Sequence, residues 1–119
     1  HKASIADQDK SYKKAIEYYQ LALEKDPTNG DAIINFAVFS AAREDYILAE
    51  LLYNRAEAIP EKAKQALLGK AQLYIDKQDH KSALLTLQKA YSRFPDLHYL
   101  PEQIEIIKSI IRTKNKELT

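Results

Sequence analysis

The segment AIEYYQLA, residues 15–22, recurs as AELLYNRA at residues 49–56 and as ALLTLQKA at residues 83–90. Successive copies begin 34 residues apart, and each has alanine at its first and eighth positions and a large residue at its fifth. Positions spaced by four and then three residues share one face of an α-helix. The small residues let a neighbouring helix approach closely, and the large residue fills the space between them. One helix pair cannot bury such a face alone, so this period predicts stacked units.

Further signals keep the same period and divide each unit into two helices. A serine or aspartate, both good N-cap residues, stands four residues before the first alanine of each copy, and a proline follows within five residues of the last. First helices are therefore expected at residues 30–43 and 61–77, and residues 1–10 have the register of the later part of another. Second helices are expected at residues 11–25, 45–59 and 79–94. The residues that carry the period are Ala3, Ala37 and Ala71; Ser11, Asp45 and Asp79; Tyr12, Tyr46 and His80; Ala15, Ala49 and Ala83; Tyr19, Tyr53 and Leu87; Ala22, Ala56 and Ala90; and Pro27, Pro60 and Pro95.

On these residues the chain resembles the tetratricopeptide repeat family, whose unit has the same length and folds as two antiparallel helices. The resemblance implies an all-α fold in which antiparallel helix pairs stack into a superhelix. It predicts a single domain over residues 1–119, with a truncated repeat at 1–29, repeats at 30–60 and 61–95, and a capping helix at 101–116.

The turn between the two helices of each unit departs from the family pattern. The glycine usual at this position is replaced by Lys10, Glu44 and Gln78. The turn is therefore expected either to use a residue other than glycine with positive φ or to adopt a different geometry. The family's tryptophan-like position is also replaced, by Ile33 and Leu67, which makes a subfamily hard to assign.

The segment after the last repeat predicts one more helix. Pro101 suits the first helical position, where its missing N–H costs nothing. Ile104, Ile107 and Ile111 then share one stripe of the helix. One interpretation is a helix that only shields the last repeat from water. The other is an oligomer surface, in which this stripe docks on a partner or on a second copy of the chain.

The sequence carries no sign of catalytic or metal chemistry. It has no cysteine, and its three histidines show no metal-ligand spacing. Neither a nucleophile-elbow motif nor a phosphate-binding glycine loop is present. We therefore expect no enzymatic activity and no cofactor or metal. The net charge of +1 is spread over 35 mixed charges, which disfavours nucleic acid as a partner, and no apolar run is long enough to predict a membrane span.

The start of the chain bears on its location in the cell. The sequence begins at His1 and contains no methionine. A leader, a membrane anchor or further repeats could therefore precede it, and the sequence favours the cytoplasm only slightly over the periplasm.

The family resemblance also implies where a partner would bind, because first helices line the concave groove in such proteins. One subset of the family clamps a terminal carboxylate with basic residues and asparagines. Only Asn35 matches that set here, since Gln65 and Gly69 occupy positions that would be basic. Acidic tails are therefore disfavoured, and an amphipathic helix or an extended apolar segment is expected instead. The residues expected to line the groove are Ile34, Asn35, Val38, Ala41, Ala42, Gln65, Leu68, Gly69, Gln72 and Ile75, with Ser4 and Asp7 from the truncated first helix.

Three functions were weighed from these features. The first is a non-enzymatic scaffold or adaptor that binds a peptide or helix of a protein partner in the groove. The alternative is an assembly module, a homo-oligomer formed through the C-terminal helix or the N-terminal edge. The third, a helical-repeat RNA binder, is disfavoured because no groove position is lysine or arginine.

Overall fold

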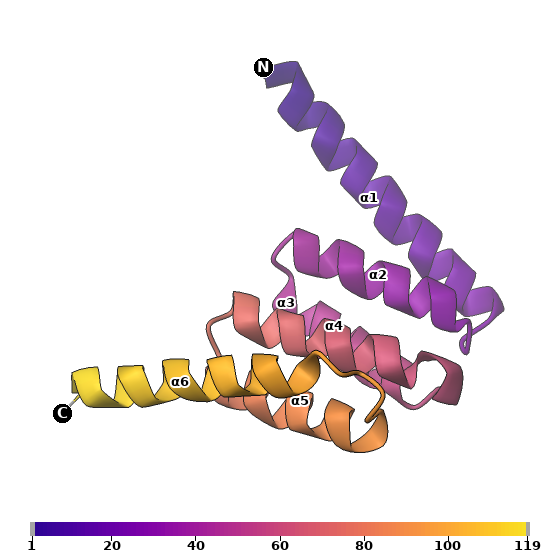
Figure 1. The fold of residues 1–119 in the computed structure, drawn as a ribbon. Helices are drawn as coiled ribbons and strands as arrows, with labels where there is room; N and C mark the ends of the chain where they lie inside the picture. The colour runs from indigo at the N-terminus through magenta and orange to yellow at the C-terminus, as the bar shows by residue number, and fades with distance from the viewer. Residues whose placement is uncertain (1, 119) are drawn as a thin grey trace.

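Helices follow one another along the whole described chain, in a computed structural model that describes residues 2–118 and the side chains of residues 9–117. Within this part of the chain there are six α-helices and no β-strand (Figure 1). The all-α prediction is therefore confirmed. The helices are α1 (Lys2–Lys25), α2 (Gly30–Ala42), α3 (Tyr46–Glu57), α4 (Ala63–Asp76), α5 (His80–Arg93) and α6 (Leu100–Leu118), with a short 3₁₀ turn η1 (Pro60–Lys62) before α4.

The helices stack in chain order. Helices α2 and α3 form one antiparallel pair and α4 and α5 form a second, while α3 packs on α4 and α5 packs on α6. Helix α2 also contacts α4, so the first helices of successive pairs are neighbours. Figure 1 shows α6 lying along α5 at the C-terminal end of the stack. This is the helix-pair arrangement that the period predicts.

The two hairpin turns use positive φ without glycine. Glu44 and Gln78 both have a φ of 63°, which is the first of the two turn geometries expected. Each is followed by an aspartate whose carboxylate caps the next helix. Asp45 Oδ1 accepts from the Leu48 amide at 3.3 Å, and Asp79 Oδ1 accepts from the Ser82 amide at 3.2 Å. These bonds satisfy amides that a helix start leaves unpaired.

The turn expected at Lys10 is absent, and that prediction is wrong. Helix α1 runs without a break from Lys2 to Lys25, a length of 24 residues. A left-handed residue other than glycine costs about 1–2 kcal/mol. In the later units, packing between helices of 12 to 14 residues offsets this cost. Lysine is a good helix former, and α1 continues through Lys10.

The repeated alanines form the centre of the stack. Ala49, Ala56, Ala83 and Ala90 all have an exposed fraction of 0%. One buried cluster lies mainly between α2 and α3 and includes Ile33 and Leu52. A second cluster lies between α4, α5 and α6. The small residues thus let successive helices approach, as their spacing predicts.

Candidate partner-binding groove

Helices α4 and α6 enclose a hollow of about 190 Å³. Three of the predicted groove residues line it, namely Leu68, Gln72 and Ile75. Leu87 of α5 also lines it, so three helices contribute. We call this site the α4–α6 hollow, and its lining residues are Leu68, Ala71, Gln72, Ile75, Leu87, Tyr99 and Gln103.

The α4–α6 hollow is apolar with a polar border. None of its lining residues is charged. Leu68 and Ile75 are partly buried and pack against the second core cluster, so their exposed edges are held in place. Gln72 is exposed, and its Nε2 donates to Asp76 Oδ1 at 2.9 Å, which fixes the amide along α4. The arrangement offers apolar contact together with amide groups for hydrogen bonding.

Two lining residues were missed from the sequence. Tyr99 precedes α6 and is 48% exposed, and Gln103 lies on the first turns of α6. No local motif marks either residue. Because each first helix contributes to the groove, continuing the pattern one helix further, into α6, would have indicated this region.

The remaining predicted groove residues lie outside the α4–α6 hollow. On α2, Asn35, Val38 and Ala42 are exposed and Ile34 is partly buried, with Val38 at 52% exposure. Gln65 is exposed on the first turn of α4. Helix α4 lines the hollow, and α2 contacts α4. The predicted residues Ser4 and Asp7 lie outside the part of the chain whose side chains are described.

Gly69 is not among the residues that line the α4–α6 hollow. A Cβ added at this position would lie 2.5 Å from Cε1 and 2.6 Å from Cζ of Tyr53, on the neighbouring helix α3. Tyr53 is 4% exposed, and its burial, together with the charge of Asp76, raises the pKa of its phenol. The position therefore faces the core, and glycine is required there by the ring of Tyr53.

The isoleucine stripe of α6 is part of the core. Ile104 and Ile107 are 8% and 5% exposed, and Ile111 is partly buried against the same cluster. These side chains hold α6 on the last repeat, so they are not open to a second copy in this structure. The exposed isoleucine of this helix is Ile106, at 52%.

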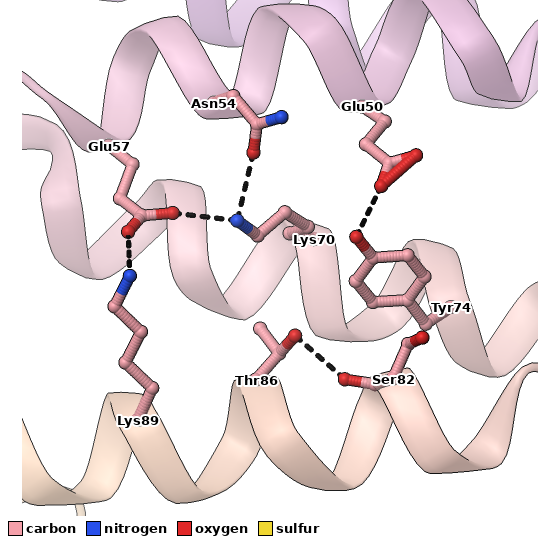
Figure 2. A network of polar contacts seen from close by, with 8 residues as sticks. All are labelled: Glu50, Asn54, Glu57, Lys70, Tyr74, Ser82, Thr86 and Lys89. Atoms are coloured by element: carbon pink, nitrogen blue, oxygen red, sulfur yellow. Dashed lines mark hydrogen bonds and ion pairs between the residues drawn. The ribbon is translucent and has the colours of Figure 1, made fainter.

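A polar network ties α3, α4 and α5 together beside the groove helices (Figure 2). The Glu57 carboxylate accepts from Lys70 Nζ at 2.7 Å and from Lys89 Nζ at 2.5 Å. Lys70 also donates to Asn54 Oδ1 at 2.9 Å, and the Tyr74 hydroxyl donates to Glu50. Burial alone would raise the pKa of Glu57, but the hydrogen bonds and charges of the two lysines outweigh it and lower the pKa.

The role of this network is to hold the helices together rather than to bind a ligand. The side chains of Glu57 and Lys70 are only 15% and 14% exposed. Their charges are therefore satisfied within the protein. Lys89 is more open, at 54%, and contributes less for that reason. Together these bonds hold α4 against α3 and α5. They therefore also fix the α4 residues that line the α4–α6 hollow.

A model of the tetratricopeptide repeat matches residues 1–29 and 64–97, which is more than half of the chain. The chain belongs to the tetratricopeptide repeat family. The second match coincides with the α4–α5 pair. No curated protein matches the chain. Tetratricopeptide repeats generally mediate protein–protein interactions, which makes a protein the class of partner that the family supports.

Two further observations describe what the tetratricopeptide stack contains. No group of three or more histidine, cysteine, aspartate or glutamate residues gathers as a metal site in the described part of the chain. Across residues 2–118, no helix combines the length and apolar character that crossing a membrane requires.

Proposed function

We propose that this tetratricopeptide chain is a non-enzymatic scaffold that binds a peptide or helix of a protein partner along α2, α4 and α6. The observation that carries the proposal is the α4–α6 hollow, in which predicted groove residues from α4 meet residues from α6. A volume of about 190 Å³ is below the 300–1,000 Å³ typical of small-molecule sites. It suits one or two anchoring side chains of a longer peptide.

The chemistry of the lining favours an apolar anchor. Leu68 and Ile75 offer apolar surface above the buried Leu87, and the lining has no cation to pair with a carboxylate. A buried carboxylate without a partner is costly, so acidic tails are poor ligands for this site. The side-chain amides of Gln72 and Gln103 can hydrogen-bond a peptide backbone at the border of the hollow.

The proposal is tested by selecting peptides from a displayed random library against the chain and measuring their binding by fluorescence anisotropy. Leu68→Glu places a charge in the α4–α6 hollow and should weaken binding at least tenfold. Leu85→Glu is the matched control, because Leu85 is 67% exposed on α5 and is not among the lining residues. The control should leave binding unchanged.

The outcomes separate the groove from other surfaces. Peptides that keep their affinity for the Leu68→Glu variant, or that lose it only with Leu85→Glu, would refute binding in the hollow. Circular dichroism of both variants establishes that each retains the helical stack.

A further inference from the structure

Another hollow lies between two second helices of the stack. It measures about 540 Å³ and separates α1 from α3, with α2 at its base. Leu23, Phe36 and Leu52 are the buried part of its lining, with exposed fractions of 9%, 4% and 3%. None of its lining residues belongs to the α4–α6 hollow. We call this site the α1–α3 hollow, and its lining residues are Gln20, Leu23, Glu24, Phe36, Leu48, Leu52 and Arg55.

The equivalent space in the next repeat is polar. It measures about 360 Å³ and lies between α3 and α5, where Glu57 pairs with Lys70 and Lys89 (Figure 2). In the α1–α3 hollow, Leu23 and Phe36 occupy the positions of Glu57 and Lys70. The same place in the stack therefore has an apolar base in one repeat and bonded ions in the next. Each residue that lines the polar space stands 34 positions after a lining residue of the α1–α3 hollow; they are Asn54, Glu57, Ala58, Lys70 and Lys89.

Helix α3 adds exposed apolar side chains beside the α1–α3 hollow. Leu48 lines the hollow, and Leu51 follows one turn later with an exposed fraction of 57%. Ile47 lies on the same side of α3 and is 80% exposed. At two of these three positions α5 is polar, with Lys81 and Ser82 in place of Ile47 and Leu48. The apolar strip is therefore a feature of α3 and not of second helices in general.

The opposite edge of the hollow is polar and carries a carboxylate. Gln20 and Glu24 stand one turn apart on α1, and both are exposed. Within residues 9–117, the Glu24 carboxylate has no ion pair and no side-chain hydrogen bond. The cation of the lining is already bonded, because Arg55 Nη2 donates to the Pro27 carbonyl at 3.0 Å. A ligand in the hollow would therefore meet apolar side chains along α3 and an unpaired carboxylate on α1.

We propose that the α1–α3 hollow binds an amphipathic helix of a protein partner, whose apolar stripe lies along α3 and whose lysine or arginine faces Glu24. A small molecule inside the hollow would leave Ile47 and Leu51 exposed, because neither residue lines it. A helix covers both the hollow and this strip with side chains three and four residues apart. The charge on α1 sets which flank of the helix is basic. The proposal does not depend on peptide binding in the α4–α6 hollow.

Binding of helical peptides tests the site. A displayed library of helices with a leucine stripe and varied flanks is selected against the chain, and peptides that also bind the Leu68→Glu variant are kept and measured by fluorescence anisotropy. Leu51→Glu should weaken their binding at least tenfold. Leu85→Glu is the matched control, because Leu85 holds the same repeat position on α5 and is 67% exposed. The proposal is overturned if no peptide is kept, or if the peptides retain their affinity for Leu51→Glu.

Charge reversal tests the orientation and remains informative if Leu51→Glu unfolds the chain, since Glu24 is exposed. Glu24→Lys should weaken the kept peptides about fivefold or more, whereas Glu102→Lys, at an exposed position on α6, should leave their affinity unchanged. Replacing the basic residue of the peptide by glutamate should restore binding to Glu24→Lys. Equal affinities for Glu24→Lys and the unmodified chain would contradict the basic flank.

Sedimentation equilibrium distinguishes a partner helix from a second copy of the chain. The chain alone should sediment as a monomer. A dimer that Leu51→Glu dissociates would show that a second copy covers the α1–α3 hollow, and would overturn the proposal of a partner helix.

Discussion

Gly69 and Tyr53 provide a quantitative test of how the helices pack. Gly69→Ala adds a Cβ that would lie 2.5 Å from Cε1 and 2.6 Å from Cζ of Tyr53. The ring cannot easily move away, because Tyr53 is 4% exposed and packed in the first core cluster. Overpacking of this kind typically costs about 1–3 kcal/mol. The contact is close enough that we expect the upper part of this range.

Helix propensity acts in the opposite direction. Alanine is favoured over glycine in a helix interior by about 1 kcal/mol. The net prediction is that Gly69→Ala lowers the free energy of unfolding by about 1–2 kcal/mol. Replacing the ring first removes the clash. Leucine is the appropriate substitute, since Leu87 occupies the position equivalent to Tyr53 in the next repeat. In the Tyr53→Leu background, Gly69→Ala should therefore stabilise the protein by up to about 1 kcal/mol.

The assay is urea denaturation followed by far-ultraviolet circular dichroism for the four proteins of this double-mutant cycle. The predicted coupling between the two positions is about 2 kcal/mol or more, with a change of sign between the backgrounds. Equal effects of Gly69→Ala in both backgrounds would show that the ring does not require glycine. A Gly69→Ala variant as stable as the unmodified chain would also refute the reasoning.

Three further predictions concern the network, the turns and the caps. Burial would raise the pKa of Glu57, but Lys70 and Lys89 together lower it in the folded protein. The ionised Glu57 therefore stabilises the fold above its unfolded pKa of about 4.3, and this stabilisation is lost as the pH falls through its lower pKa in the folded state. Glu57→Gln should therefore destabilise the protein at neutral pH and flatten the decline in stability on acidification, as urea midpoints measured across pH would reveal. Gln78→Gly should raise the free energy of unfolding by up to about 1 kcal/mol, because Gln78 has a φ of 63° that glycine adopts without strain. Lys10→Gly lies inside the continuous helix α1 and should lower the stability by a similar amount, measured by unfolding followed with circular dichroism. Asp79→Ala should lower the free energy of unfolding by about 0.5–2 kcal/mol, measured by thermal or urea unfolding, because the Asp79 carboxylate caps α5. An Asp79→Ala variant as stable as the unmodified chain would contradict that role.

The features that the sequence predicts well are those set by local chemistry and by the period. The helix pairs and the aspartate caps follow from residues that recur at fixed spacing, and the positive φ at Glu44 and Gln78 is one of the two turn geometries that the missing glycine left open. The missing turn at Lys10 shows the limit of the period. The register continues through residues 2–10, but the turn depends on how much packing the folded segment gains, which a spacing does not report.

Other features depend on contacts between distant residues. Glu57 and Lys89 are 32 residues apart in the chain, and neither belongs to the repeated pattern. Gly69 was predicted to line the groove from its position in the repeat, whereas a Cβ at this position would point at the ring of Tyr53. Similarly, Tyr99 and Gln103 reach the α4–α6 hollow only because α6 packs on α5. Such contacts need the packed arrangement before they can be identified.

The most direct test of the proposed scaffold function is to map a bound peptide by solution NMR. The isotope-labelled chain is titrated with a peptide selected from the library, and backbone amide shifts are followed residue by residue. The account predicts that the largest shifts fall on Leu68, Gln72, Ile75 and Gln103, which line the α4–α6 hollow. Shifts concentrated instead around Leu85, on the exposed surface of α5, would contradict it.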